Sequence, residues 1–389
     1  MADDRAEDQS FDFTLPEGMK LLQKTAREFA DREIRPHVMR FDEAQEFPTD
    51  VIRQMGELGF LGAVVPENLG GSGLTTLEFT LIMEEIARVD PSVGLILAAH
   101  SGLCLQHLLM FANDAQKARY VPPLASGRII GSWALTEPES GSDSGGMKTT
   151  AVRDGETFVL NGSKTFITNG SVAGTFVVMA KTDLEKAKSG ISAFIVEKSM
   201  GLGVARKENK LGFRASDTVQ IVLDHVRVPA ANLLGNVGEG FKQALGVLDS
   251  GRIGIAALSV GLAQGALEAA IRYARERKQF GRPIAEFQAT QFKLAEMATG
   301  IEAARLLTHK AALDKQRGKP YTLAASQAKL FASEVAQRAA AGAVQIHGGY
   351  GFTKDFPVEK LYRDAMLLTI GEGTSEVQRM VIAKQLLSE

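Results

Sequence analysis

The sequence predicts an α+β protein of three domains. These are an N-terminal helical domain over 1–128, a middle β-barrel or sandwich-like domain over 129–232, and a C-terminal four-helix bundle over 233–389. The chain has 389 residues, which is too many for one ordinary hydrophobic core. The spacing of its apolar residues also changes twice, from helical to strand-like and back to helical. We therefore expect a β domain that packs its apolar face against another layer.

The N-terminal block, from Pro16 to about Arg128, has helical periodicity. Two sets of apolar residues recur at helical spacing, namely Leu22, Ala26 and Phe29, and then Val51, Met55 and Leu58. Asp50 stands directly before the second set, so we expect it to be the N-cap of that helix. A glycine-rich loop over 66–73 precedes another predicted helix around 77–87.

The middle block changes to runs of β-branched and aromatic residues. These runs cover 157–160, 164–168, 175–180, 191–196 and 219–228. The Asn161-Gly162 pair between the first two runs predicts a β-hairpin turn, and Asn169-Gly170 predicts a second turn. The block is therefore expected to be all-β.

The C-terminal block returns to long segments rich in Ala, Leu, Gln and Arg, which is the composition of a helical bundle. Its helices are expected to break at 281–283, 318–320 and 348–349. A last helix is predicted to begin at Ser375, because Ser375 and Gln378 have the spacing of a capping box. Its inner face is expected to hold Val377, Met380 and Val381.

Composition excludes several classes of function. Hydrophobic residues make up 45% and charged residues 23%, an ordinary balance for a soluble globular protein. Lys+Arg 44 against Asp+Glu 46 gives a net charge of −2 with no long basic run, so we expect no nucleic-acid partner. One cysteine excludes an internal disulfide, and six scattered histidines predict no metal site.

The N-terminus is acidic and polar, unlike a signal or transit peptide. We expect a cytoplasmic protein, or one of the mitochondrial matrix if a transit peptide was removed. The apolar stretch 93–111 is roughly long enough to span a bilayer. It carries His100, Ser101, Gln106 and His107, however, and we interpret it as a buried helix and expect no membrane segment.

Glu372 is the strongest candidate for a catalytic residue. It lies between Gly371 and Gly373, directly before the last predicted helix. Glycines here let the backbone come close to a ligand, or equally to a neighbouring helix. Taken alone, an acid in such a turn is usually a solvated loop residue, but three other segments point to the same site.

These segments, and a cluster of glycines at 348–351, each have an ordinary structural explanation when taken alone. Residues 135–143 offer hydroxyls and glycine amides to a planar polar ligand, or form a hydrophilic loop. Residues 166–170 place an aromatic ring and a hydroxyl at a turn, or simply end a hairpin. The basic cluster of Arg272, Arg275, Arg277 and Lys278 can bind phosphates or be a solvated helix end, and the glycines at 348–351 are also typical of a helix stop.

Common alternative sites fail on spacing. No strand leads through Gly-x-Gly-x-x-Gly into a helix, so a Rossmann dinucleotide site is not supported. The chain has neither a Walker A sequence nor a Gly-x-Ser-x-Gly elbow, which leaves no basis for an NTPase or that type of hydrolase.

In this order and spacing, the motifs resemble the acyl-CoA dehydrogenase family, over nearly the whole chain. The matching segments are 136–138 with 141–143, 166–170, 277–281 and 372–374. One match would be weak, but four in register are highly specific. Residues 248–255 are most similar to the short-chain and bacterial branch.

The resemblance implies an enzyme that binds FAD noncovalently and acts as a homo-oligomer, usually a tetramer. The residues implied to line the flavin are Trp133, Leu135, Thr136, Gly141, Ser142, Phe166, Ile167, Thr168, Thr374 and Glu376. Those implied to reach the FAD of a neighbouring subunit are Arg277, Phe280, Gln288, Gln345, Ile346, Gly348 and Gly349. Ser142, Asp249, Arg252 and Gly373 are implied to contact the acyl-CoA.

The resemblance also gives Glu372 its role. It implies oxidation of an acyl-CoA to the trans-2-enoyl-CoA, in which Glu372 takes the α-proton and the β-hydride goes to flavin N5. A carboxylate desolvated by flavin and substrate has a raised pKa and is a better base. The family also places the backbone N–H of the base at the thioester oxygen, with a ribityl hydroxyl of FAD. Electrons are then expected to pass to an electron-transfer flavoprotein.

Some relatives carry the catalytic carboxylate at the position of Gly251, which cannot serve here. Three departures stand out. Phe166 replaces a common tryptophan beside the flavin, Glu139-Ser140 replaces small residues, and Gly371 replaces a frequent aromatic, which would widen the pocket.

Three alternative functions agree less well with the sequence. An acyl-CoA oxidase that uses oxygen is commonly longer, with an extra helical domain missing here. A non-catalytic binding scaffold would be expected to have lost the base or a flavin motif. A flavoprotein monooxygenase or nitroalkane oxidase on this fold would typically have another residue in place of Glu372.

The substrate is open within the class. A straight short or medium acyl-CoA is our default, with branched, cyclic or aromatic acids not excluded. By analogy, residues 95–105 would form the pocket floor. His100 and Cys104 in that stretch are interpreted as buried helix residues with ordinary partners.

Overall fold

In this computed structural model, residues 14–388 are described. The N-terminal helices are α1 (Glu17–Phe29), α2 (Val38–Ala44), α3 (Thr49–Glu57), α4 (Thr76–Val89), α5 (Pro91–Leu97), α6 (Gln106–Phe111) and α7 (Asp114–Ala125). Helix α4 confirms the helix predicted after the glycine-rich loop, and Thr75 and Glu78 cap it reciprocally. The expected N-cap at Asp50 is wrong by two residues. Pro48 is the N-cap of α3, and Asp50 lies inside the first turn, where a negative charge favours the helix dipole.

The chain from α5 to α6 is one continuous helical stretch with a π-helical middle, η4 (Ala98–Leu105). Such π segments widen a helix and are frequent at functional sites. Two stretches, Pro91–Phe111 and Gly240–Glu276, are apolar and long enough to cross a membrane. Their most apolar windows are 72% and 78% buried inside the protein, as in the core helices of soluble proteins.

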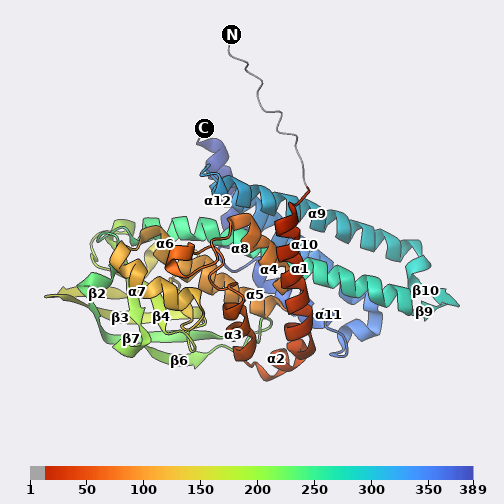
Figure 1. The fold of residues 1–389 in the computed structure, drawn as a ribbon, viewed down its shortest axis with the longest axis horizontal. Helices are drawn as coiled ribbons and strands as arrows, with labels where there is room; N and C mark the ends of the chain where they lie inside the picture. Colours follow the sequence, from red (N-terminus) through yellow and green to blue (C-terminus); the bar gives the residue numbers. More distant parts are fainter. Residues whose placement is uncertain (1–13, 389) are drawn as a thin grey trace, which may run out of the picture.

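The middle of the chain forms a sheet of eight strands. They are β1 (Gly131–Ala134), β2 (Thr150–Asp154), β3 (Thr157–Thr168), β4 (Thr175–Lys181), β5 (Ile191–Glu197), β6 (Gly203–Lys207), β7 (Thr218–Pro229) and β8 (Leu233–Leu234). The order is β6-β7-β3-β2-β4-β5-β8, mainly antiparallel, with β1 added in parallel to β4. One face of this sheet packs under the N-terminal helices and α8 (Figure 1).

The predicted hairpin at Asn161-Gly162 is wrong. β3 runs straight through this pair, which forms a bulge against β7. A side chain at Gly162 would come within 2.4 Å of the Thr149 hydroxyl, so glycine is needed there for close approach. The turn lies earlier, at Gly155 between β2 and β3, whereas the second predicted turn, at Asn169-Gly170, does end β3.

The C-terminal helices are α8 (Gly240–Glu276), α9 (Gln288–Gln316), α10 (Thr322–His347), α11 (Val358–Leu368) and α12 (Ser375–Leu387). A small hairpin, β9 (Lys278–Gln279) with β10 (Arg282–Pro283), joins α8 to α9. Helix α8 runs through the centre of the molecule and packs on α4, α9 and α10 (Figure 1). The three breaks expected in this block are present.

Helix α12 corrects two predictions. Its N-cap is Thr374, whose hydroxyl accepts from the Val377 N–H, so the capping position lies one residue before Ser375. Its buried face carries Ser375 and Gln378, while Met380 is 71% exposed.

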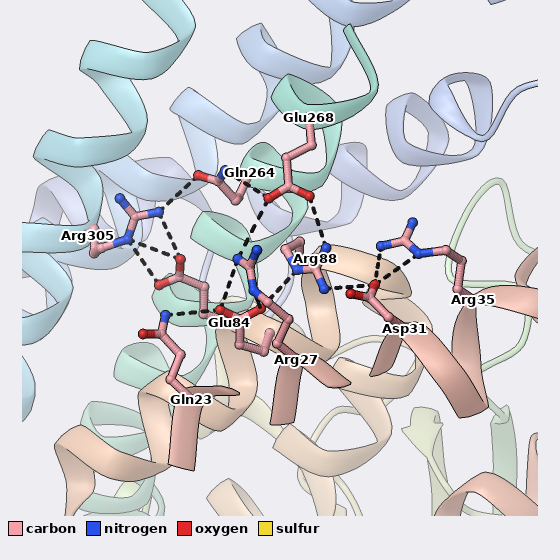
Figure 2. Close-up of polar contacts among 10 residues, drawn as sticks. Gln23, Arg27, Asp31, Arg35, Glu84, Arg88, Gln264, Glu268 and Arg305 are labelled. Carbon is pink, nitrogen blue, oxygen red and sulfur yellow. Dashed lines mark hydrogen bonds and ion pairs between the residues drawn. The ribbon is translucent and has the colours of Figure 1, made fainter. Parts of the chain in front are cut away.

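Glycines bring α8 close to α4. A Cβ at Gly261 or Gly265 would lie 2.3 or 2.2 Å from the carbonyl oxygens of Glu84 and Arg88. An ion network lies at this contact and joins α1, η1 (Ala30–Ile34), α4, α8 and α9 (Figure 2). Arg88 donates at 2.9 Å to each of Glu85, Glu268 and Asp31.

Candidate active site

Glu372 lies in the short loop between α11 and α12, in an unusual backbone conformation. Its φ is 53° and that of Gly373 is 92°, so both residues occupy the left-handed region. The Gln378 amide donates to the carbonyls of Glu372 and Gly373 at 3.3 and 3.0 Å, and Lys329 Nζ donates to Gly373 at 2.7 Å. These bonds stabilise a conformation that is costly for a non-glycine residue and fix where the carboxylate points.

The two flanking glycines have different reasons to be there. A side chain at Gly373 would come within 2.7 Å of Gln378 and would also be strained by its φ. At Gly371 the nearest atom would be 3.6 Å away, an ordinary contact. A side chain is sterically tolerated at 371, so its absence leaves open space beside the base.

The Glu372 carboxylate is buried without a hydrogen bond. The residue as a whole is half-buried, but Oε2 is inaccessible and has no partner among the described residues. Burial raises the pKa of Glu372 to about 7, against the positive charges of Lys329 and Arg252, which lower it. The carboxyl group therefore titrates near neutral pH, where a general base works best.

Gly251 on α8 lies directly beside this carboxylate. A Cβ at Gly251 would be 2.4 Å from Glu372 Oε2 and 2.9 Å from Leu103. Any side chain at 251 would therefore compete with the carboxylate for the same space. The glycine makes room for the acid.

Asp249 and Arg252, expected at the acyl-CoA, lie one helical turn apart on α8 and form an ion pair at 2.5 Å. The other Asp249 oxygen accepts from Thr322, and Arg252 also donates to Ser326 at 3.3 Å. Arg252 Nε has no hydrogen-bond partner within residues 14–388. Ser142, expected at both flavin and acyl-CoA, is exposed in the loop after β1.

Four orphaned buried polar atoms gather around this loop. They belong to Glu372, Arg252, Ser375 and Gln378. Buried polar atoms are rarely left without partners, so their concentration here indicates a site built to receive a polar ligand.

The segments expected at the flavin come together at the ends of β1 and β3. Trp133 donates its indole N–H to His107 Nδ1 at 3.0 Å, which sets the ring orientation. Phe166 has φ 57° at a bulge of β3 and is 64% exposed, although it is a large aromatic residue. Leu135 and Ile167 are buried below this edge, and Thr136 and Thr168 are half-buried. An exposed ring held in a strained backbone, next to hydroxyl-bearing residues, fits a planar aromatic cofactor.

A buried ion pair holds the loop that carries Gly141 and Ser142. Lys164 Nζ lies 2.8 Å from Glu137 Oε1, and the same carboxylate accepts from the backbone N–H groups of Lys148 and Thr149. Glu137 thus acts as a structural anchor of this loop.

The basic and glycine-rich set lies elsewhere. A cleft of about 550 Å³ at the β9–β10 end is lined by Arg277, Gln279, Ile346, Gly348 and Gly349, among others. Phe280 (φ 50°) is 93% exposed. Gln288 and Gln345 are exposed at this end too but do not line the cleft. Figure 1 shows β9 and β10 at the opposite end of the molecule from the sheet, so one chain does not bring this set to the sheet that carries Phe166.

Sequence reasoning missed two residues that hold the base. Lys329 sits within an alanine-rich stretch of α10, and a lysine on such an apolar face is the signal that would have found it. Gln378 was assigned to a capping box, but it binds the carbonyls of the base loop instead. Thr374 caps α12, and Glu376 is exposed in its first turn.

Helices packed on a sheet, a buried carboxylate oxygen and an exposed aromatic edge fit a flavoprotein oxidoreductase. Three family models match the chain: acyl-CoA dehydrogenase, N-terminal domain, at 16–128; middle domain, at 132–226; and C-terminal domain, at 238–387. The chain therefore belongs to the acyl-CoA dehydrogenase family, whose members are FAD-dependent flavoproteins. It is an oxidoreductase with FAD as its cofactor.

Individual relatives match this chain over all or nearly all of their own length. "Probable acyl-CoA dehydrogenase YngJ" of Bacillus subtilis is 49% identical, covering 96% of this chain and 99% of the relative. The structure of butyryl-CoA dehydrogenase from Megasphaera elsdenii has a TM-score of 0.95 and 43% identity over 97% of this chain and 100% of its own. A chain from the structural study of the electron transferring flavoprotein of Acidaminococcus fermentans has a TM-score of 0.96, with 47% identity over 97% and 100%. The predicted family and three-domain fold are confirmed.

Proposed function

We propose that the protein oxidises a short acyl-CoA to the trans-2-enoyl-CoA, with Glu372 as the base that takes the α-proton. The observation that carries this proposal is the Glu372 carboxylate, whose Oε2 is buried without a hydrogen-bond partner among the described residues and whose pKa burial raises to about 7. An acid in that state is ionised often enough at neutral pH to accept a proton and is not weakened by donors. The short chain length is suggested by the similarity to butyryl-CoA dehydrogenase.

The loop also offers a donor to the thioester oxygen. Among the described residues, the Gly371 N–H donates to Leu367 at 2.8 Å, whereas the Glu372 N–H donates to none. A free, fixed N–H beside the base would stabilise the negative charge that develops on the oxygen as the α-proton leaves. The bonds from Gln378 and Lys329 keep that N–H in place.

Asp249 and Arg252 would position the thioester, and the open space at Gly371 would admit its reacting carbons. FAD, when bound, supplies the acceptor for the β-hydride at flavin N5. Trp133, Phe166 and Thr168 would hold its ring at the edge of β1 and β3.

We propose that a second copy of the chain completes the cofactor site, in a homotetramer. The support is the separation of the cleft at Arg277 from the edge at Phe166, together with the exposed aromatic Phe280. An electron-transfer flavoprotein is the proposed electron acceptor, because a similar chain occurs in the flavoprotein study described above.

Arg277→Ala tests the shared site. We expect the variant to lose FAD on gel filtration, seen as a lower ratio of flavin to protein, since a cation that binds phosphate is removed. Arg53→Ala, on the surface of α3, is the control. A stable, fully flavinated tetramer of Arg277→Ala would contradict the assignment.

The function itself is tested by an anaerobic visible spectrum of the FAD-loaded protein, titrated with butyryl-, octanoyl- and isobutyryl-CoA. We expect butyryl-CoA to bleach the flavin band at the lowest concentration. Bleaching by none of the three would overturn the proposed reaction. Rapid reoxidation by oxygen would favour an oxidase over electron transfer to a flavoprotein.

A further inference from the structure

A small cavity lies beyond the base, between η4, α4, α8 and α9. Its volume is about 20 Å³, which is room for roughly two water-sized groups. The cavity is lined by the backbone at Gly102, Gly251 and Gly254. The apolar side chains of Ala98 and Phe79 also line it. Because Gly251 also borders the Glu372 carboxylate, the cavity is placed to receive the far end of a short acyl chain.

One wall of this apolar cavity is polar. It is formed by Gln106, Ser250 and Lys315. Lys315 Nζ donates to Ser250 Oγ at 2.5 Å and to Gln106 Oε1 at 3.2 Å. Ser250 and Gly251 are consecutive residues of α8. Lys315 donates to Ser250, and the Glu372 carboxylate lies beside Gly251.

Lys315 has no anionic partner. No carboxylate of residues 14–388 pairs with it, and burial alone lowers the pKa of Lys315 to about 8. A buried ammonium bonded only to neutral oxygens is costly, because its charge is desolvated without compensation.

Two of the other buried lysines have carboxylate partners, whereas Lys329, within the described part of the chain, donates only to the Gly373 carbonyl. Lys164 pairs with Glu137, and Lys360 pairs with both Asp90 and Asp364. Each of these cations was buried together with a carboxylate. Lys315 has no such carboxylate among the described residues and lines the cavity instead.

We propose that this cavity binds the terminal carboxylate of a short dicarboxylic acid carried as its CoA monothioester, with Lys315 as the counter-ion. The inference rests on the proposed function and names its substrate class. Ser250 would add a hydrogen bond to the same carboxylate. The reaction is unchanged: the Cα–H and Cβ–H bonds break, the C2=C3 bond forms, two electrons pass to FAD, and the terminal carboxylate stays intact.

The test compares two thioesters of equal chain length, glutaryl-CoA and pentanoyl-CoA, on the FAD-loaded enzyme. We expect kcat/KM for glutaryl-CoA to exceed that for pentanoyl-CoA by at least tenfold. Lys315→Met should lower kcat/KM for glutaryl-CoA on the order of 100-fold, the scale for losing one partner of a desolvated ion pair, and leave pentanoyl-CoA equal or improved. The Kd of glutaryl-CoA, from the change in the flavin spectrum on mixing, should rise in parallel.

Lys310→Met is the matched control, because Lys310 lies on the same helix but pairs with Asp314 at the surface. It should leave the ratio of the two substrates unchanged. Equal turnover of both thioesters by the wild type, or an unchanged ratio in Lys315→Met, would overturn the inference alone. Failure of the wild type with every thioester would overturn the proposed function, and the inference with it.

Discussion

Two clusters of buried charge include residues of α8, and they differ in whether their charges are paired. In the network of Figure 2, Arg88 and Glu85 are almost fully buried, and every charge has an opposite partner. Around Glu372, one carboxylate oxygen and Arg252 Nε are also inaccessible, but neither has a hydrogen-bond partner among the described residues. The first arrangement stabilises the packing of four helices, and the second keeps a group reactive at the expense of stability.

The largest effect is expected from Glu372→Gln. Removing the base while keeping its shape should lower kcat for acyl-CoA oxidation by about 10²- to 10⁴-fold, the usual contribution of a general base. Stopped-flow bleaching of the flavin measures the chemical step. Near-normal turnover with FAD retained would show that another group takes the proton.

Arg88→Met should break the other cluster. It leaves Glu85 buried without its partner, which is expected to reduce the free energy of unfolding by about 3–5 kcal/mol. Urea denaturation measures it. Arg53→Ala removes an exposed ion pair with Glu57 and should have no measurable effect. If both variants lost the same stability, the distinction between buried and surface pairs would fail here.

The pH dependence of stability should differ between wild type and Glu372→Gln. Since the folded pKa of Glu372 is about 7, above its unfolded value, its favourable contribution is present at pH 4 and is lost as pH rises through 7. The Gln variant should therefore match the wild type at pH 4 and be more stable at pH 8, by on the order of 2–3 kcal/mol. A difference that is the same at both pH values would contradict the raised pKa.

Lys329→Met gives the smallest expected effect. The Lys329 charge lowers the pKa of Glu372, so its loss should move the acid limb of kcat/KM to higher pH, by roughly one pH unit. A pH–rate profile from 5 to 9 measures this shift. Lys310→Met should leave the profile in place.

Much of the fold and of the site was visible in the sequence because it depends on local patterns. The change of period marked the sheet, and the motifs around Glu372 and Phe166 were contiguous. The errors came where two local solutions use the same residues. Asn161-Gly162 serves a bulge as well as a turn, and Thr374 and Ser375 are both good N-caps.

What the sequence could not show were partners brought together from distant segments. Lys329 meets Gly373 across 44 residues, and Lys315 meets Gln106 across 209. The presence of a lysine in the sequence does not show whether its charge will be paired in the fold. Pairing depends on which helices the tertiary packing brings together. The charge balance of a site is therefore a property of the fold.

Gly251 has a consequence for how this chemistry can be inherited. Its missing side chain would occupy the place that the Glu372 carboxylate now fills, although the two residues lie 121 positions apart. The catalytic acid is thus defined by its position in space, and side chains from two separate segments can reach that position. During evolution, the catalytic acid could move from one segment to the other without a change in the reaction. The position that lost the acid would then need a small residue.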